Sequence, residues 1–482
     1  MIIRKSPLQT PWFRALSDEQ CEQLYQDSLV CLQRVGVKVL NEEARDVLGT
    51  AGCRVEGERV YIPPQLVKDA LAVTQREFTI WGRKEGQDIQ IENGRVHFGP
   101  GPTCTYFIDP FSGERRRAQR GDAAMVACVC DALDNLDYTM SLSIFDDVIP
   151  ALSPLYEFAE LIAHSTKPPI AWATGPAILA EIYRVAAVVA GGEEALRRRP
   201  NFAFFATYES PLKHADGQMG AQLWAARQGI PVVCLGGPTV GLESPPTGAS
   251  ALILFLAAAL SALTIIQTAT PGAAMAIGAA LGAMDLRTAR PAYGSPEMSL
   301  YTAGAADLAR YLGVPFMGTA GASESKELDA QAGVEIAFQV LLSAMSGANL
   351  VHDVGFLDCA DIGSLELLIL ADEAISMTRH MLRGVEVTPQ SSFLDLIEKV
   401  GPGEHFLSQP QSVSLCKKEI WVPKVFDRNA YAVWERNGSI TLLERIRARV
   451  QNIIGKSPQS VLSKEQQTQV NRILAQAVGK YS

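Results

Sequence analysis

Short apolar runs recur through the middle of the chain, and their spacing limits the possible folds more than any other feature. Successive runs begin about 30 to 40 residues apart, and each is bounded by turn-forming residues. The segments between them, such as "SPLYEFAELIAHSTK", carry the periodicity of amphipathic helices. The runs are "YTMSLSIF" from 138, "PIAWAT" from 169, "NFAFFATY" from 201, "PVVCLGG" from 231, "AAMAIG" from 273, "GVPFMGT" from 313 and "ANLVHDVG" from 348.

These runs are apolar on both faces, which is typical of strands buried in a parallel sheet. An earlier candidate within "RVHFGPGPTCTYFID" brings the number to eight. Eight strands that alternate with helices predict an α/β fold, a closed (β/α)8 TIM barrel. The alternative is an open doubly wound sheet, but no glycine-rich phosphate-binding fingerprint begins a helix, and "GPGP" at 99–102 contains too many prolines to be one.

The flanking sequence predicts extensions of the barrel. Within 1–94, Ser17 is expected to cap the first of two helices, and strands from 77 onward are expected to form an antiparallel sheet with a turn at Asn93 and Gly94. The barrel is expected to occupy 95–390. Residues 391–482 are expected to form a C-terminal helical extension.

Composition narrows the function. The formal charge is -9, and the short basic runs lack interleaved aromatic residues, so no nucleic-acid partner is expected. The nine scattered cysteines are typical of reduced thiols, and the first 20 residues lack the apolar core of a signal peptide, so we expect a cytoplasmic protein. No histidine or cysteine pair has metal-ligand spacing, which predicts no metal site.

One segment needs a separate decision, because residues 244–284 contain no charged residue and "ASALILFLAAALSALTIIQ" approaches the length of a membrane span. The segment is rich in alanine and is interrupted by Pro271 and Gly272. We therefore expect a buried helix followed by a strand, and no membrane association. The high apolar content also suggests a homo-oligomer.

Candidate functional residues follow from the predicted barrel, since catalytic residues of such barrels gather at the C-terminal ends of the strands. At the end of the last run, His352 and Asp353 are either part of a site or a satisfied polar pair. Neighbouring residues of a strand face opposite sides, so Asp353 either orients the imidazole or points away from it. The strand ends carry Phe98, Trp172, Tyr208, Glu209, Thr239, His352, Asp353 and Phe356.

Several stretches of the sequence resemble the trimethylamine methyltransferase superfamily over nearly the whole chain. Among them are "VHFGPGPTCTYFIDPFSGERR", "DLRTARPAYGSPE", "GTAGASESKELDAQAGVE" and "NLVHDVGFLD". The resemblance implies a TIM barrel that transfers a methyl group from a methylamine to the cobalt of a corrinoid protein. Trimethylamine enzymes of the family carry pyrrolysine, whereas this chain has only standard residues, so it is more similar to the branch that acts on quaternary amines.

This resemblance implies demethylation of glycine betaine to dimethylglycine. A quaternary nitrogen leaves as a neutral amine, so no general acid is needed. The corrinoid (cobalamin) is expected on a separate corrinoid-binding protein, because no histidine here lies in an Asp-x-His-x-x-Gly motif. The alternatives are another betaine such as proline betaine or carnitine, and a non-catalytic betaine-binding barrel.

Binding of such a substrate predicts roles for the candidate residues. A quaternary ammonium is held by aromatic faces, for which Phe98, Trp172, Tyr208 and Phe356 are the candidates. Glu209 and Asp353 would add electrostatic attraction. The substrate carboxylate needs donors, which His352, Thr239 and Arg287 can supply, although a surface ion pair between Arg287 and Asp285 is an equally good interpretation.

Overall fold

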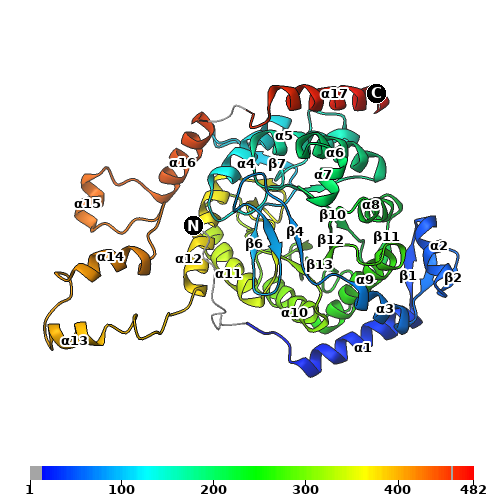
Figure 1. The fold of residues 1–482 in the computed structure, drawn as a ribbon, viewed down its shortest axis with the longest axis horizontal. Helices are drawn as coiled ribbons and strands as arrows, with labels where there is room; N and C mark the ends of the chain where they lie inside the picture. The colour runs from blue at the N-terminus through cyan, green and yellow to red at the C-terminus, as the bar shows by residue number, and fades with distance from the viewer. Residues whose placement is uncertain (1–12, 457–459, 482) are drawn as a thin grey trace.

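A parallel β-sheet forms the centre of the molecule in the computed structural model, which describes residues 13–456 and 460–481. Every strand pairing in this sheet is parallel. Figure 1 shows the strands at the centre of a ring of helices. The seven strands lie in the order β6 (His97–Phe98), β17 (Leu350–His352), β16 (Phe316–Thr319), β13 (Met275–Ala279), β12 (Val232–Gly236), β10 (Ala203–Thr207) and β9 (Ile170–Trp172).

Helices alternate with these strands along the chain and cover the outer face of the sheet (Figure 1), which confirms the predicted α/β fold. Six of the seven regularly spaced apolar runs form strands of the sheet, and the earlier candidate supplies β6. The covering helices are α4 (Arg120–Ala132), α5 (Ser153–His164), α6 (Pro176–Ala190), α8 (Asp216–Arg227), α9 (Gly248–Ala269), α10 (Pro296–Leu312), α11 (Ala330–Ser346) and α12 (Leu365–Leu382).

The run at 138–145 differs from the prediction, because it forms only isolated bridges instead of a strand. Leu142 has a φ of 63°, a left-handed conformation that interrupts a ladder. The segment nevertheless lies between the two edge strands. Its Asp137 N–H donates to the Phe98 carbonyl at 2.7 Å on one side, and its Thr139 carbonyl accepts from Ile170 N–H at 3.0 Å on the other.

A β-hairpin fills the N-terminal end of the sheet's concave face. It consists of β4 (Phe78–Ile80) and β5 (Ile89–Ile91), whose isoleucines are buried against the inward-facing side chains of the strands. Residues beside the hairpin form backbone hydrogen bonds with residues that lie just before strands of the sheet. For example, Trp81 N–H donates to the Pro200 carbonyl at 2.8 Å. The hairpin therefore covers the inner face at the N-terminal ends of the strands.

The predicted antiparallel sheet is only partly correct. β4 and β5 do pair antiparallel, but the turn at Asn93 and Gly94 leads into β6 of the parallel sheet instead of a further antiparallel strand. The run "CTYFID" supplies β7 (Tyr106–Ile108), which pairs with β8 (Arg115–Arg117) and β19 (Ile362–Gly363). Because β6 pairs in parallel with β17, β6 is not part of the antiparallel hairpin of β4 and β5.

The N-terminal region packs beside α9. Ser17 caps α1 (Asp18–Arg34) through a capping box, as predicted, and α2 (Glu42–Thr50) is the second expected helix. α1, α2 and α3 (Pro64–Val73) contact α9. A small sheet joins β1 (Val37–Val39), β2 (Arg54–Glu56) and β3 (Arg59–Tyr61) to β11 (Lys213–His214).

α9 has the length and hydropathy of a membrane span, yet 78% of its most apolar window is buried inside the fold. It is followed by β13, so the prediction of a buried helix and a strand is confirmed. The structure describes all nine cysteines, and all are free thiols.

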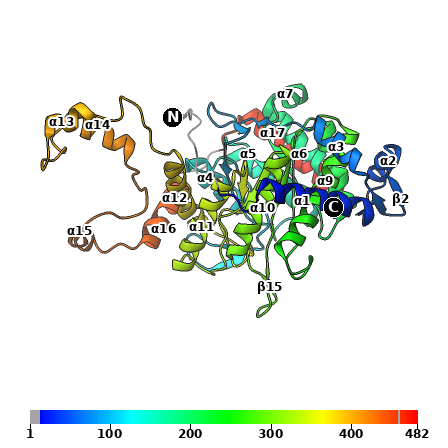
Figure 2. The ribbon, with the colours of Figure 1, turned by 90° about the horizontal axis from the view of Figure 1, so that it is seen from below.

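The C-terminal region is helical, as predicted. α16 (Leu442–Lys456) packs on α12 and α4, and α17 (Lys464–Tyr481) packs on α6. Between α12 and α16, the chain leaves the body with α13 (Leu394–Val400), α14 (Pro410–Glu419) and α15 (Tyr431–Arg436), which project to the left in Figures 1 and 2. The division of the chain at residues 94 and 390 stays a prediction.

Candidate functional site

His352 is the last residue of β17 and faces the concave side of the sheet. It lies two positions after Leu350, whose side chain belongs to the inner core, and alternate residues of a strand share a face. Thr319 on the neighbouring strand β16 and Phe205 on β10, which is not adjacent to β17, reach the same place. The imidazole lies 5.7 Å from the Phe205 ring between centroids, and its Nε2 lies 3.0 Å from Thr319 Oγ1.

The hydrogen bonds of Thr319 indicate which nitrogen of the His352 imidazole carries a hydrogen. The Thr319 hydroxyl donates to the Ala279 carbonyl at 3.0 Å, so its one hydrogen is committed and it accepts from His352 Nε2–H. The other ring nitrogen, Nδ1, lies 2.5 Å from Asp353 Oδ1 but has no hydrogen bond of acceptable geometry among the described residues. His352 is 3% exposed, so this nitrogen is buried.

Asp353 turns toward His352 instead of away from it. Its φ of 73° takes the chain out of the extended conformation at the end of β17, so the alternation of strand neighbours ends there. The Tyr293 hydroxyl donates to the other carboxylate oxygen, Oδ2. Gly101 lies so close that a Cβ at this position would collide with Asp353 and Phe356. The structure therefore joins His352, Asp353 and Phe356 in one buried cluster.

Trp172, the last residue of β9, is half-buried and belongs to the same inner face as Phe205. Its indole N–H donates to Glu157 Oε2 on α5 at 2.6 Å. Glu157 also accepts from the hydroxyls of Ser141 and Ser153, at 2.7 and 2.9 Å. Burial raises the pKa of Glu157 to about 7, although these three hydrogen bonds oppose the shift. This carboxyl therefore orients the indole ring and can carry a proton near neutral pH.

Phe98 and Tyr208 lie on the other side of the strands. Phe98 pairs in register with Val351, an outer-face residue, and Arg379 of α12 stands 5.8 Å above its ring. Tyr208 is 4% exposed, and its hydroxyl lies 3.3 Å from the Gly278 carbonyl. Both belong to the core between sheet and helices, so the structure does not bring them together with His352 and Trp172.

The three remaining candidates lie in loops after strands. Glu209 is exposed and forms an ion pair with Lys213. Thr239 is half-buried, and its backbone N–H donates to Glu243 at 2.9 Å. Arg287 lies on the hairpin of β14 (Met284–Asp285) and β15 (Arg290–Pro291), which projects from the body in Figure 2. Its side chain is 88% exposed and forms a 2.7 Å ion pair with Asp285, the surface pairing that the sequence allowed.

Four residues of this region were missed by the sequence analysis, namely Glu157, Phe205, Tyr293 and Thr319. Thr319 ends a predicted strand, and the strand-end rule could have identified it. Glu157 lies on a helix and Tyr293 in a long connection, positions that the rule does not cover. Among the described residues, no group of three or more histidine, cysteine or acidic side chains is arranged to hold a metal ion.

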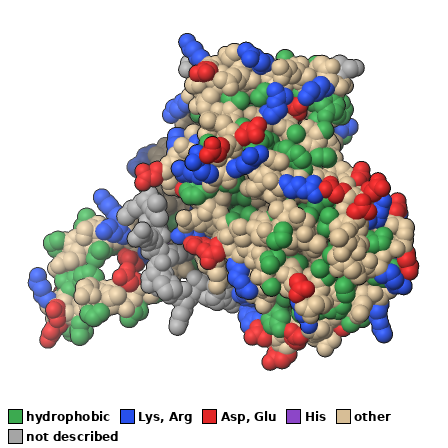
Figure 3. Space-filling model, turned by 45° about the vertical axis from the view of Figure 1, so that its right-hand side comes forward, with side chains coloured by type: hydrophobic (Ala, Val, Ile, Leu, Met, Phe, Trp, Pro, Cys, Tyr) green, Lys and Arg blue, Asp and Glu red, His purple; other side chains and the backbone are tan. Residues whose placement is uncertain are grey.

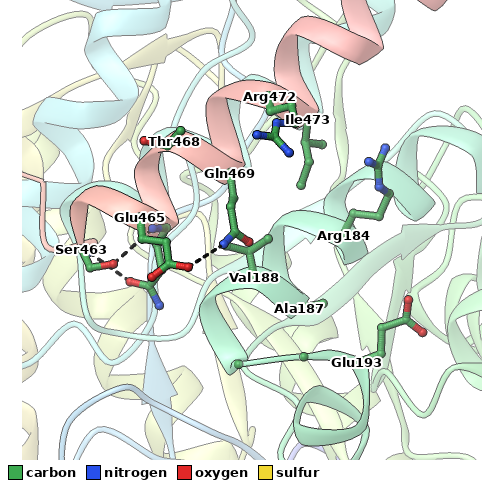
Figure 4. A pocket seen from close by; sticks show the side chains of 13 residues that line it. Arg184, Ala187, Val188, Glu193, Ser463, Glu465, Thr468, Gln469, Arg472 and Ile473 are labelled. Carbon is green, nitrogen blue, oxygen red and sulfur yellow. Dashed lines mark hydrogen bonds between the residues drawn. The ribbon is translucent and has the colours of Figure 1, made fainter.

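A groove of about 1120 Å³ lies elsewhere, on the outer surface between α6 and α17 (Figure 4). Arg184, Glu193, Glu465 and Arg472 contribute charges of both signs to its walls. None of the candidate residues lines it, and Arg184 is already paired with Glu181 and Gln476. The groove has no aromatic lining and is not the candidate site.

Comparison with known proteins adds to this geometry. Residues 3–478 match the family "Trimethylamine methyltransferase (MTTB)". A glycine betaine methyltransferase of Desulfitobacterium hafniense (strain Y51) is 28% identical over 97% of both chains. The trimethylamine methyltransferase MttB of D. hafniense (strain DSM 10664 / DCB-2) is 29% identical over 89% of this chain and 87% of its own. MttB2 of Methanosarcina mazei is 30% identical over 90% and 89%.

Among solved structures, the Methanosarcina barkeri monomethylamine methyltransferase (MtmB) aligns with a TM-score of 0.46 at 12% identity, over 90% of this chain and 98% of that chain. The family match spans nearly all of the sequence, and its named relatives are methyltransferases of amines. The chain therefore belongs to the trimethylamine methyltransferase family and is an amine methyltransferase.

Proposed function

We propose that this enzyme transfers a methyl group from a quaternary amine, glycine betaine, to the Co(I) of a corrinoid held by a separate protein. The observation that carries the proposal is the meeting of aromatic rings and an imidazole on the inner face, toward the C-terminal ends of the strands. Trp172 and Phe205 supply the rings and His352 the imidazole. These are the groups that a betaine needs at its two ends.

Trp172 is the residue best placed to bind the ammonium. A quaternary nitrogen has no hydrogen to donate, so an aromatic face is its preferred contact, worth about 0.5 to 2 kcal/mol. The bond from the indole N–H to Glu157 fixes the ring plane. When Glu157 is ionised, its negative charge behind the indole adds attraction for the cation without contacting it.

His352 is the proposed partner of the substrate carboxylate. Its Nδ1 lies beside Asp353 without a hydrogen bond of acceptable geometry among the described residues, so this is the ring atom that a substrate carboxylate would engage in place of Asp353. The bond to Thr319 holds the ring in place. A carboxylate bound here would compete with Asp353, and the hydroxyl of Tyr293 would keep the Asp353 side chain on its far side.

In the methyl transfer itself, the main role of the protein is to position the substrate. The reduced corrinoid would supply the attacking cobalt, and the C–N bond electrons leave with dimethylglycine as a neutral amine. No proton moves in this step, so it needs no general acid. The protein's contribution is to hold the methyl in line and to exclude water.

Glycine betaine is preferred over trimethylamine on two grounds. The glycine betaine relative matches 97% of both chains, against 87% to 92% for the trimethylamine relatives. The chain also consists of standard residues, so it lacks the pyrrolysine that the resemblance associates with trimethylamine.

The test mixes the enzyme with reduced free cobalamin and one amine at a time, and follows methylcobalamin formation by its absorbance. We expect turnover with glycine betaine and none with trimethylamine. Faster turnover with proline betaine or carnitine would change the substrate. Tight betaine binding without methyl transfer would make the protein a binding module, and turnover with trimethylamine alone would refute the proposal.

The finer architecture belongs to the same proposal. We infer that the sheet closes into a (β/α)8 barrel, with 137–142 as the eighth element. The hydrogen bonds of this segment to both β6 and β9 support closure. A cytoplasmic location follows from the proposed chemistry, because a Co(I) corrinoid and nine free thiols both require reducing conditions.

A further inference from the structure

Residues 384–441, here called the arm, leave the body after α12 and return at α16. Val425 is the one buried residue in this segment, all of which the structure describes. Figures 1 and 2 show α13, α14 and α15 projecting away from the ring of helices. These helices have 7, 10 and 6 residues, shorter than the roughly 12 to 15 that an isolated helix needs for stability in water. Packing against another surface must therefore stabilise them.

The arm is strongly apolar for an exposed segment. Of the 27 large hydrophobic side chains that are exposed among the described residues, 12 lie in the arm. They amount to on the order of 1,000 Å² of apolar surface, above the about 800 Å² per partner of a standard stable interface. Figure 3 shows hydrophobic side chains gathered on the projecting lobe. The six most exposed are Val385, Val387, Leu394, Leu407, Val422 and Tyr431.

The root of the arm is firmly attached to α12. Glu373 accepts the backbone N–H groups of Lys424, Val425 and Phe426 at 2.8, 2.9 and 3.2 Å. Nearby, the Trp421 indole donates to Ser376 Oγ at 3.0 Å. These bonds hold the segment between α14 and α15 against α12, so the arm is anchored to the body between its projecting helices.

A second exposed apolar surface lies on the body beside this root. Val334 and Phe338 are 71% and 46% exposed and lie one turn apart on α11, and Met377 and Met381 are 44% and 47% exposed and lie one turn apart on α12. α11 and α12 pack side by side, and these four exposed residues, in the first half of α11 and the last turns of α12, are here called the α11–α12 strip. The arm begins three residues after Met381, so strip and arm are continuous.

We propose that the arm of one subunit packs on the α11–α12 strip of a second copy of this chain, in a reciprocal exchange about a two-fold axis. A two-fold contact places each arm against the partner's strip and buries both apolar surfaces with one operation. Because the strip adjoins the root of the arm, the two exchanged contacts meet near the axis and form a continuous interface.

A second copy fits this surface better than a methyl-carrying protein does. Permanent interfaces are more hydrophobic than transient ones, and a carrier must dissociate after each transfer. The arm also lacks a net charge that would steer a rapid encounter, since its seven acidic residues are nearly balanced by six lysines and arginines. The proposal does not depend on which amine the enzyme demethylates.

The experiment measures the mass of the full-length protein in solution by sedimentation equilibrium from 0.1 to 50 µM. The arm variant carries Leu394→Asp with Leu407→Asp, and the strip variant carries Val334→Asp with Phe338→Asp. The control carries Val30→Asp with Val73→Asp, which are 43% and 46% exposed on α1 and α3. All six positions are exposed, so circular dichroism should show the same fold in every variant.

We expect a dimer or a larger assembly for the unchanged protein and the control, and at least a 100-fold weaker association for each of the other two variants. An equimolar mixture of arm and strip variants should regain dimers, because one intact arm then meets one intact strip. A monomeric unchanged protein, or variants with unchanged mass, would overturn the proposal. A mixture that stays monomeric would also overturn the proposal, because it would indicate arm–arm contact. Loss of carrier binding at unchanged mass would overturn it as well, because it would assign the arm to the carrier.

Discussion

Replacing Glu157 by glutamine is expected to flatten the dependence of protein stability on pH. Burial raises the pKa of this carboxyl to about 7, against an ordinary value of 4.5. Between these two values the folded protein holds a proton that the unfolded chain has released. The free energy of unfolding therefore falls as pH rises through this window, and the loss is complete above about pH 8.

The structure sets the size of this effect. At about 1.4 kcal/mol per pKa unit, the difference between the two values corresponds to about 3 to 4 kcal/mol. Glutamine has the same shape and is neutral at every pH. Its oxygen can accept from Ser141 and Trp172, and its amide can donate to Ser153, so the hydrogen bonds survive. At pH 5 the variant should thus match the unchanged protein within about 1 kcal/mol.

The assay is urea unfolding at pH 5, 6, 7 and 8, followed by circular dichroism. The unchanged protein should lose up to about 3 kcal/mol relative to the variant between pH 5 and pH 8. Parallel curves for the two proteins would refute the reasoning, because they would mean that Glu157 is ionised throughout.

Glu181→Gln provides a matched control with the opposite sign. Glu181 is also buried, which by itself raises its pKa, but hydrogen bonds from Lys480 and Arg184 lower the pKa below the ordinary value overall. Its ionised form therefore stabilises the fold, and this contribution is lost only at acidic pH. The control should be less stable than the unchanged protein at pH 8, and the difference should shrink toward pH 4.

Four further substitutions test the site. His352→Ala should raise the KM for betaine about 5- to 150-fold, the equivalent of about 1 to 3 kcal/mol for a charge-assisted hydrogen bond; a lowered Tm with unchanged KM would instead make it a structural residue. Trp172→Phe should raise the KM about 2- to 30-fold by weakening the cation–π contact, and an unchanged KM would remove Trp172 from the site. Tyr293→Phe should lower stability to urea by about 1 to 3 kcal/mol, because the buried Asp353 loses a donor, and an unchanged midpoint would contradict this. Arg287→Ala should change neither Tm nor KM, since the side chain is exposed and paired on the surface; a raised KM would show that it binds the substrate carboxylate.

The strands of the sheet were predictable because residues buried on both faces must be apolar, and turn-forming residues mark their ends. The failure at 138–145 has a local cause. "YTMSLSIF" has the composition of a strand, but Leu142 adopts a left-handed conformation that nothing in the sequence requires. Asp353 is a similar case. Its positive φ overrides the alternation of side chains and brings it beside His352.

The arm shows a different limit of sequence reasoning. Its helices were predicted as part of 391–482, but periodicity records only that apolar residues recur, and gives no indication of what they contact. In α12 such residues face the core, whereas α13, α14 and α15 have no buried residue. Only the structure separates apolar residues that the chain covers from those left for another surface.

Phe98 and Tyr208 show why a strand end alone is too coarse a guide to a site. Each ends a buried strand with an aromatic ring, as Trp172 does. Whether a ring points inward depends on its distance along the strand from a residue on the inner face, because an odd number of positions places it on the opposite face. Tyr208 is three positions after the inner-face residue Phe205. Phe98 pairs with Val351, which is one position before the inward-facing His352. Trp172 lies two positions after Ile170 and so shares the inner face. Counting parity from one inward-facing residue on each strand would therefore have kept Trp172 and His352 together and placed Phe98 and Tyr208 beneath the helices, where they stabilise the scaffold of the site without lining it.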